Sequence, residues 1–417
     1  MTGTQPGAAA ATLLEGNVAR PPQALYLHVP FCVSHCPYCD FVVVAGREAR
    51  GPSNRIAAFT DALATEVQLR ADALDATWGP PAGRPPLASV YLGGGTPSLL
   101  PASSISSLLD VARGRFGLGA DAEFTLEVNP GPDERGDAIA QVAAGVTRLS
   151  IGAQSFVPEE LRVLGRRHTP EDIRATVAAA RRAGARSISL DLLYDVPGQT
   201  ERSWARSVEA ALALDPDHLS LYALTLDDPD AEGLTGGIGD HLPTSTGARQ
   251  WRARARAGQD DDRAAALYAA ADQRLAAAGL PWYEISNWAR PGHASRHNLA
   301  YWEGGAWEAV GPGAHAFDGV TRRWNAARLD SYLGALAPRD GGPPRLPPGG
   351  GEPAVAAEGE ITALRTSTGL PAAALDTDRG PVLRWGLDQG LLEAANDRLV
   401  LTRRGRLLSN ELFARLV

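Results

Sequence analysis

The chain has 417 residues, of which 44% are hydrophobic, so it is long enough for two domains with a sizeable core. It carries 40 Lys and Arg against 48 Asp and Glu, and this net charge of −8 argues against nucleic-acid binding through bulk charge. Residues 1–22 lack the apolar core of a signal peptide, and no apolar run approaches the roughly 20 residues of a membrane span. We expect a soluble, cytoplasmic protein with a disordered tail over residues 1–22.

Short apolar segments alternate with helical stretches in the first half of the chain, as buried parallel strands alternate with the helices that connect them. The predicted strands are residues 24–31, 89–93, 123–128, 148–152, 187–193 and 218–224. The predicted helices between them are residues 56–74, 105–115, 136–144, 170–183 and 202–214. This alternation predicts an α/β fold, a partial (β/α)6 TIM-like barrel over residues 23–230, with functional residues where strands end.

An extension of the barrel is expected over residues 231–337. Within and just before it, residues 227–262 are rich in Gly, Asp and Arg, which predicts a mobile loop, and residues 263–278 are expected to form a helix. Residues 338–355 carry Gly-Gly-Pro-Pro and Pro-Pro-Gly-Gly-Gly, which predict a linker.

A small C-terminal domain is predicted over residues 356–417. Its expected elements are a helix at residues 382–390, a hairpin around Asn396-Asp397 and a last helix at residues 404–416, an outline similar to a winged helix. Such folds often bind DNA, but no helix here is strongly basic, so we expect no nucleic-acid partner.

All three cysteines lie within eight residues, in Cys32-x3-Cys36-x2-Cys39, just after the first predicted strand. Clustered thiolates are typical ligands of one metal centre, and three closely spaced cysteines do not suit a disulfide framework. A [4Fe–4S] cluster held by three thiolates leaves one iron free to bind a small molecule. Structural zinc with His28 or His35 as the fourth ligand is the alternative, although such sites usually come as two pairs of ligands.

A glycine turn, Gly93-Gly94-Gly95-Thr96-Pro97, follows the second predicted strand. Glycine lets a ligand approach the backbone closely and exposes amide N–H donors. Taken alone, the turn is equally typical of a tight exit from a strand.

Polar side chains also mark the ends of the later strands. Glu127 ends the third predicted strand and Gln154 ends the fourth. Asp191 lies within the apolar fifth strand, where a charge is costly unless it is paired. Arg166 or its neighbour Arg167 is suited to bind a carboxylate, because a guanidinium does so through two parallel hydrogen bonds.

The string Tyr26-x-His28-x-Pro30-Phe31-Cys32-x3-Cys36-x-Tyr38-Cys39 resembles the cluster loop of radical S-adenosylmethionine (SAM) proteins, and among them the coproporphyrinogen dehydrogenase group. The resemblance implies a [4Fe–4S] cluster on the three cysteines, whose free iron binds the amino and carboxylate groups of SAM. It also implies cleavage of SAM to methionine and a 5′-deoxyadenosyl radical, with an electron donor such as flavodoxin or ferredoxin. The implied SAM contacts are Tyr26, Tyr38, Gly94, Gly95, Thr96, Glu127, Gln154, Arg166, Asp191 and Ala223.

A second diagnostic segment, His297-Asn298-Leu299-Ala300-Tyr301-Trp302, precedes Gly311-Pro312-Gly313-Ala314-His315. Lone histidines are usually packed or exposed rather than ligands, but imidazole binds iron and aromatic rings stack on a flat macrocycle. The HNxxYW string resembles the signature of HemW-type heme chaperones. That resemblance implies bound heme, apo-hemoprotein recipients and peripheral contact with membrane-bound respiratory enzymes, and it is compatible with a homodimer. His297 is the first candidate heme ligand and His315 the second.

Two functions of different classes remain. The first is a heme chaperone that delivers heme to apo-hemoproteins such as respiratory enzymes. The second is an oxygen-independent coproporphyrinogen III dehydrogenase, which releases CO2 from two propionates to form protoporphyrinogen IX. The dehydrogenases carry a further cysteine two positions after the third cluster thiol, where this chain has Phe41, and their ordered N-terminal segment is longer. We therefore predict the chaperone, and the sequence leaves open whether SAM is cleaved or only bound.

Overall fold

The structure is a computed structural model that describes residues 18–51, 54–337 and 341–417. Its centre is a sheet with the strand order β14-β13-β12-β11-β1-β4-β5-β6-β7-β8-β10-β9. The parallel strands of the barrel are β1 (Ala24–Val29), β4 (Leu87–Gly94), β5 (Leu118–Val128), β6 (Arg148–Gln154), β7 (Ser187–Tyr194) and β8 (His218–Ala223). Each pairs in parallel with the next, which confirms the predicted (β/α)6 barrel. The sheet ends at β14 and β9, so the barrel is open across the described residues.

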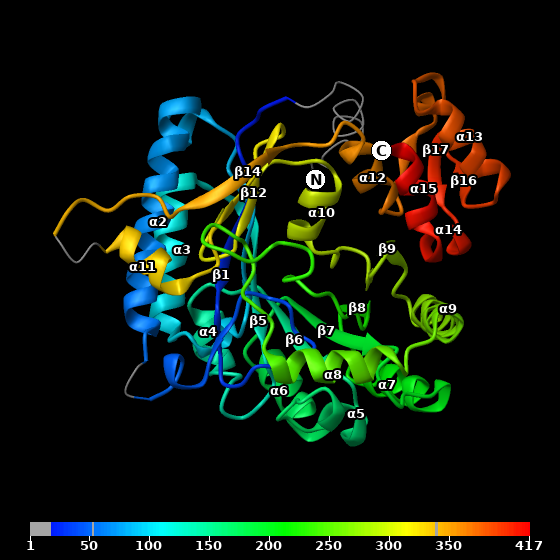
Figure 1. Ribbon diagram of the computed structural model, residues 1–417, viewed down its shortest axis with the longest axis horizontal. Coiled ribbons are helices and arrows are strands. Elements are labelled where there is room, and N and C mark those ends of the chain that lie inside the picture. The colour runs from blue at the N-terminus through cyan, green and yellow to red at the C-terminus, as the bar shows by residue number, and fades with distance from the viewer. Residues whose placement is uncertain (1–17, 52–53, 338–340) are drawn as a thin grey trace.

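Helices cover the outer face of this sheet (Figure 1). They are α2 (Ile56–Trp78), α3 (Ala102–Phe116), α4 (Ala138–Ala143), α5 (Pro158–Val163), α6 (Pro170–Arg182) and α7 (Glu201–Leu212). Leu25 and Leu27 of β1, both fully buried, belong with Phe59 and Leu63 of α2 to one apolar core. Burial of this kind stabilises the packing of helix on strand, because apolar surface of both elements is removed from water. Helix α5 lies in a segment where no helix was predicted.

Local sequence signals fix where these helices begin. Thr169 caps α6 and Thr200 caps α7, each in a capping box in which the side chain accepts from the third helical N–H. Short elements join the main ones: β2 (Phe31–Cys32), β3 (Val44–Ala45), and the 3-10 turns Gly46–Glu48, Pro81–Gly83 and Pro97–Leu99.

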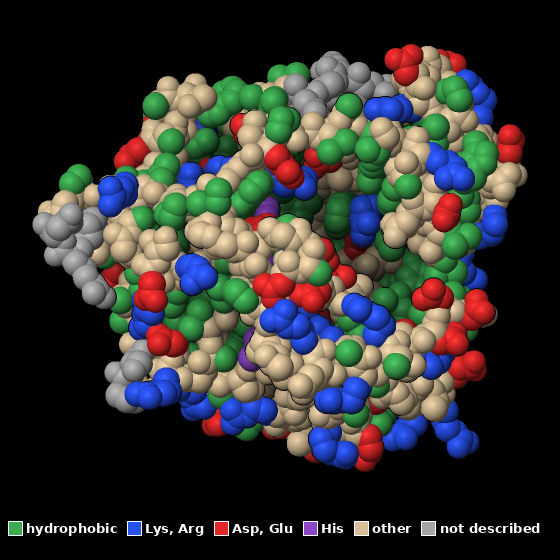
Figure 2. Space-filling view, viewed as in Figure 1, with side chains coloured by type: hydrophobic (Ala, Val, Ile, Leu, Met, Phe, Trp, Pro, Cys, Tyr) green, Lys and Arg blue, Asp and Glu red, His purple; other side chains and the backbone are tan. Residues whose placement is uncertain are grey.

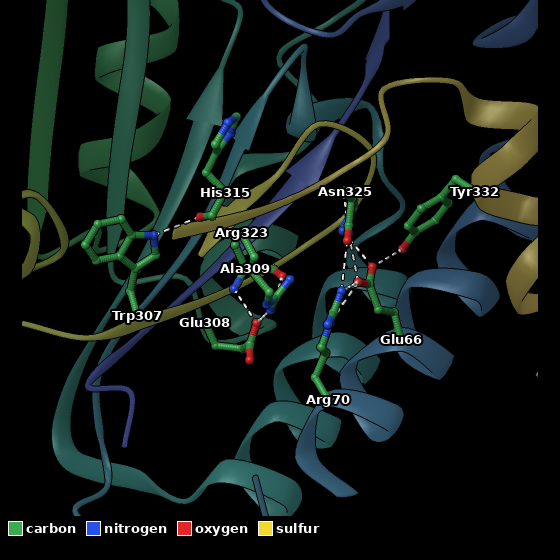
Figure 3. A network of polar contacts seen from close by, with 10 residues as sticks. Glu66, Arg70, Trp307, Glu308, Ala309, His315, Arg323, Asn325 and Tyr332 are labelled. Atoms are coloured by element: carbon green, nitrogen blue, oxygen red, sulfur yellow. Dashed lines mark hydrogen bonds and ion pairs between the residues drawn. The ribbon is translucent and has the colours of Figure 1, made fainter. Parts of the chain in front are cut away.

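The barrel is extended at both edges of the sheet. Strands β9 (Trp282–Glu284) and β10 (Asn287–Ala289) follow β8, and β11 (Trp307–Val310), β12 (His315–Phe317) and β13 (Thr321–Asn325) continue beyond β1. The helices of this region are α8 (Thr246–Arg256), α9 (Asp261–Ala277), α10 (Arg296–Trp302) and α11 (Leu329–Leu336). The carboxylate of Glu66 on α2 binds Asn325 of β13 and Tyr332 of α11, which ties the extension to the barrel (Figure 3).

Two of the predicted irregular segments contain regular structure. The expected mobile loop at residues 227–262 includes α8, whose buried face consists of Ala248, Arg252 and Ala255 rather than large apolar side chains. The expected linker at residues 338–355 includes β14 (Gly349–Pro353), which pairs with β13. Its glycines allow the backbone to lie against the Trp324 ring, where a Cβ on Gly350 would clash. Residues 338–340 of that segment lie outside the described residues.

The predicted tail also lies largely outside the described residues. Its described part, residues 18–22, has no helix or strand, but the Arg20 N–H donates to the Asp318 oxygen at 2.8 Å. This contact places the start of the described chain beside the turn between β12 and β13.

The C-terminal elements form a small module with its own apolar core. They are α12 (Glu358–Leu364), β15 (Leu370–Pro371), a 3-10 turn (Ala372–Asp376), α13 (Gly380–Asp388), β16 (Leu392–Ala395), β17 (Arg398–Leu401), α14 (Arg403–Leu407) and α15 (Ser409–Leu416). The expected hairpin turns at Asn396 and Asp397, which both have positive φ. The single last helix that was expected is instead two helices that meet at Leu408. Among the described residues, no helix has the length and apolarity needed to cross a membrane.

Candidate functional site

The carboxyl ends of adjacent parallel strands bring most of the predicted site residues together. Val29 lies opposite Gly94, Val128 opposite Ile151, and Tyr194 opposite Ala223. The cysteine loop, the glycine turn and the later strand ends therefore follow one edge of the barrel in spatial order. This is the edge at which barrels with parallel strands carry their functional residues.

The three thiols of the cysteine loop are free and partly buried. The Thr96 hydroxyl donates to Cys32 Sγ at 3.4 Å, and Arg166 Nη1 donates to Cys36 Sγ at 3.7 Å. Burial raises the pKa of Cys32 to about 12 and also raises the pKa of Cys39, with repulsion from the other thiols as a further cause. A cation bound between the sulfurs would reverse these shifts, because a coordinated thiol is deprotonated.

Nothing in the described residues gathers three or more His, Cys, Asp or Glu side chains as ligands of one metal ion. His28, the first alternative zinc ligand, has both ring nitrogens engaged, with the Tyr26 hydroxyl at 3.1 Å and the Val42 oxygen at 2.8 Å. His35, the second, is exposed. A [4Fe–4S] cluster suits the three thiols better than a single ion, since each thiolate then binds a different iron.

The glycine turn packs against the cysteine loop. The Gly95 N–H donates to Val29 O at 2.8 Å, and the Thr96 N–H donates to Phe31 O at 2.7 Å. The Gly94 N–H donates to Glu127 Oε2 at 2.9 Å. The expectation that these amides are exposed donors is therefore wrong, because all three are used within the protein. Gly94 has φ of 111°, and a Cβ there would clash with the His28 ring.

Glu127 connects the glycine turn to the interior of the barrel. Its second carboxylate oxygen accepts from the Tyr91 hydroxyl at 2.9 Å. Burial raises the pKa of Glu127 to about 7, against the opposing effect of the two hydrogen bonds. A buried carboxyl group with a pKa this far from its usual range is a candidate functional residue.

Of the two candidate arginines, the structure points Arg166 toward the cysteine loop and leaves Arg167 exposed. Arg166 Nη2 donates to Asn129 Oδ1 at 2.7 Å and to Gly152 O at 3.0 Å. Its Nε is buried and has no partner among the described residues. An unpaired buried donor on a charged group is costly, so Arg166 has capacity for an anionic ligand.

The remaining predicted contacts line the same interior. Gln154 has φ of 62° at an irregularity between β6 and β7, an uncommon conformation for a non-glycine residue. Asp191 accepts hydrogen bonds from Ser150 at 3.1 Å and Ser189 at 3.3 Å, and burial raises its pKa. These hydroxyls explain how the apolar β7 strand accommodates a carboxyl group.

The two tyrosines of the cysteine-loop string have different neighbours. Tyr26 stacks on Tyr91 with ring centroids 6.1 Å apart. Tyr38 packs near Trp251 of α8.

One residue of this site had no signal in the sequence. Arg252 of α8 is buried and donates to Pro37 O at 3.1 Å and to Cys39 O at 2.8 Å. An arginine in a polar segment gives no pattern that predicts a contact with a loop so far away in the chain. Only the fold reveals that it holds the cysteine loop.

Comparison with known proteins identifies the family. A family model described as the radical SAM superfamily matches residues 26–211. The heme chaperone HemW of Mycobacterium tuberculosis is 40% identical over 393 residues, which cover 93% of each chain. The chain belongs to the HemW family. The HemW of Escherichia coli is 37% identical over 72% of this chain and 71% of its own. The resemblance drawn from the cysteine loop and the HNxxYW string is thereby confirmed.

Among solved structures, the coproporphyrinogen III oxidase HemN of Escherichia coli, a radical SAM enzyme, has the same fold. The TM-score is 0.72 over 99% of this chain and 93% of that chain, at 23% sequence identity. This likeness confirms the expected fold class.

The histidine of the HemW-type string is buried within the barrel. His297 Nδ1 lies 3.0 Å from Ser89 Oγ, and His297 Nε2 lies 2.7 Å from the Tyr301 hydroxyl. Burial lowers the pKa of His297 to about 3, so the ring is neutral. Ser89 lies near the start of β4, whereas the glycine turn begins in its last two residues, so His297 is remote from the cysteine loop along that strand. Neither ring nitrogen is free to bind an iron in this conformation.

The second candidate, His315, lies at the surface of β12. Its Nε2 is 2.8 Å from Asp240 Oδ2, its Nδ1 is 3.1 Å from Gly313 O, and its side chain is 36% exposed. The two candidate histidines therefore differ in accessibility, which the sequence did not reveal: His297 is buried and His315 is partly exposed.

Proposed function

We propose that this protein is a heme chaperone that binds heme and passes it to apo-hemoproteins such as respiratory enzymes. Family membership carries this proposal, because the HemW relative from Mycobacterium tuberculosis is similar over nearly the whole chain. Phe41 supports it, since the coproporphyrinogen dehydrogenases resembled by the cysteine loop have a further cysteine at that position.

We further propose a [4Fe–4S] cluster on Cys32, Cys36 and Cys39, with SAM beside it. When bound, the cluster would supply the electron that cleaves SAM. Thr96 and Arg166 donate hydrogen bonds toward two of the three sulfurs, which supports a thiolate site.

The proposed SAM contacts follow from the polar groups at the ends of the strands. The unpaired Arg166 Nε suits the SAM carboxylate, and Glu127 suits the ribose hydroxyls. The carbonyls of the glycine turn suit the amino group, because the N–H groups of the turn are already used. Gln154, Asp191 and Ala223 complete the set at the neighbouring strand ends, with Tyr26 in the interior and Tyr38 in the cysteine loop.

The location of the protein, its electron donor and its protein partners are also proposals. We expect a cytoplasmic protein that receives electrons from a flavodoxin or ferredoxin, forms a homodimer, and makes peripheral contact with membrane-bound respiratory enzymes. A heme donor to such enzymes must approach them, which is the reason to expect that contact.

Heme titration of the anaerobically reconstituted chain tests the function. We expect a shifted Soret band and no conversion of coproporphyrinogen III in the presence of SAM and a reductant. Turnover with release of CO2 would instead support the dehydrogenase, which is the second candidate because its cluster loop is similar.

A further inference from the structure

A pocket of about 590 Å³ lies between β11–β13, the end of α10 and the start of the C-terminal module. Figure 2 shows that this face of the molecule is hollowed beside that module. The volume lies within the range of pockets that enclose a ligand of drug size. The walls include Tyr301, Trp302, Trp307, His315 and Phe317, so the pocket is rich in aromatic rings.

The strand register places one wall on a single face of the sheet. Trp307 lies opposite Phe317, and Phe317 lies opposite Arg322. His315 precedes Phe317 by two residues in β12, so its side chain projects from the same face. The Trp307 indole N–H donates to the His315 oxygen at 2.8 Å, which fixes the two residues relative to each other (Figure 3). The result is a cluster of aromatic rings with an imidazole beside it, in which the Trp307 and Phe317 ring centroids are 5.2 Å apart and the two ring planes are inclined by 45°.

The pocket also contains hydrogen-bond donors without partners. Trp302 Nε1 and Arg322 Nε are both buried and unpaired among the described residues. Arg20 and Arg379, both half-buried, line the same pocket; Arg20 Nε donates to the Val18 oxygen at 3.2 Å, and within the described part of the chain neither arginine has a carboxylate partner. Unpaired buried donors favour an anionic ligand, because binding relieves the cost of their desolvation.

Acidic side chains are present in the pocket as well. Glu358 is paired with Arg322, while Glu303, Glu360 and Asp378 also line the walls, so four carboxyl groups face three arginines. The pocket is therefore not uniformly basic, and its preference for a carboxylate rests on the position of the free donors rather than on net charge.

We infer that the heme of the proposed function binds in this pocket, against Trp307 and Phe317, with His315 as its iron ligand and with Arg20 and Arg379 binding the two propionates. The choice of heme as the ligand rests on the proposed function. The location of the heme rests on the residues that line the pocket. A metalloporphyrin has a flat aromatic ring to pack on the aromatic side chains, two carboxylates to bind the arginines, and a metal that binds imidazole.

His315 is better placed than His297 for this role. Among the residues that line the pocket it is the only histidine, and it needs to release only the contact of Nδ1 with Gly313 O to free a nitrogen. Asp240 would stay on Nε2, and a carboxylate on the second nitrogen is the usual partner of a metal-bound imidazole. His297 is buried, its two ring nitrogens lie against Ser89 and Tyr301, and it is not among the residues that line the pocket.

Parallel titrations of the full chain with ferric heme and with metal-free protoporphyrin IX test the assignment. Both ligands share the flat ring and the propionates, and only heme offers iron. We expect His315→Ala to change the Soret band and weaken heme binding by about tenfold, with protoporphyrin binding unchanged. We expect Arg379→Ala and Arg20→Ala to weaken both ligands by about tenfold, since each removes a charge-assisted contact. His293→Ala, which lies outside the pocket, serves as the matched control and should bind both ligands normally.

The results for the wild-type chain and for the variants test the heme-chaperone function and the heme site separately. A wild-type chain that binds no heme would refute the proposed function and the site together. A wild-type chain that binds heme, with a His315→Ala variant that keeps the native Soret band and affinity, would refute the iron ligand. Arginine variants that bind both ligands as the wild type does would refute the pocket. Circular dichroism of each variant establishes that it is folded.

Discussion

The guanidinium of Arg252 donates to the backbone oxygen of Cys39 across 2.8 Å, although the two residues are 213 positions apart in the chain. The same group donates to the oxygen of Pro37 at 3.1 Å. Arg252 is 5% exposed, so these are partly buried, charge-assisted contacts. Helix α8 thus holds the backbone of the cysteine loop between its second and third thiols.

Arg252→Leu should reduce retention of the proposed cluster, because two backbone oxygens of the cysteine loop lose a charged donor, each such bond being worth about 1.5–3 kcal/mol. The measurement is iron and sulfide per chain after anaerobic reconstitution and gel filtration. Arg254→Leu, an exposed arginine on the same helix, is the control and should keep a full complement. Equal iron in both variants would show that α8 does not support the loop.

The two neighbouring arginines at residues 166 and 167 offer a matched test of the SAM site. Arg166→Gln should weaken SAM binding by about ten- to hundredfold, because a buried charged donor is lost. Arg167→Gln should leave it unchanged, since Arg167 is exposed. Equilibrium dialysis with SAM, with iron measured in the same samples, gives the affinity. Equal losses in the two variants would contradict the assignment of Arg166.

Sequence patterns predicted the strands well because each contains a short apolar run that is mostly buried. The residues that end those strands were predictable for the same reason, since a polar side chain such as Asp191 is conspicuous in an apolar run. The ordinary periodicity of buried elements failed at α8, whose buried face includes the charged Arg252. It failed again at β14, where glycines that resemble a linker are required by the ring of Trp324. Both errors arise where a specific tertiary contact replaces hydrophobic burial.

The position of His297 shows a second limit of prediction from sequence. Its string indicated the family correctly, but no pattern reveals that Ser89 and the Tyr301 hydroxyl occupy both ring nitrogens. A motif indicates that a residue is characteristic of a family. It does not indicate whether the side chain faces a ligand or the protein interior. Accessibility, which favours His315, belongs to the fold.

The buried carboxyl group of Glu127 should make stability depend on pH. Its pKa is raised from 4.5 to about 7, so the folded chain binds this proton more tightly than the unfolded chain does. The stabilising contribution is complete below about pH 4.5 and is lost as the pH rises through 7.

In the chain without cluster or SAM, Glu127→Gln should therefore be less sensitive to pH between these values than the wild type. Thermal unfolding at pH 5 and pH 8 measures this, with Glu159→Gln at an exposed site as the control. An unchanged pH dependence in Glu127→Gln would mean that this carboxyl group titrates normally.

The carboxylate of Glu66 is the anchor of the strands that carry the pocket. It is fully buried and binds Arg70, Asn325, Tyr332 and the N–H of Gly311, the last three at 2.8 Å (Figure 3). Gly311 begins the turn that leads to β12. Removal of the carboxylate leaves the nearly buried charge of Arg70 and three further donors without their acceptor.

Glu66→Ala should lower the free energy of unfolding by about 3–5 kcal/mol, as expected when one partner of a buried ion pair is lost. Urea denaturation measures the change. Glu171→Ala, which breaks the exposed ion pair with Arg174, should cost about 1 kcal/mol or less. Because Glu66 also fixes the turn before His315, the variant should bind heme more weakly than Glu171→Ala does, even where both are folded. Two variants of equal stability would show that the buried carboxylate does not anchor this part of the sheet.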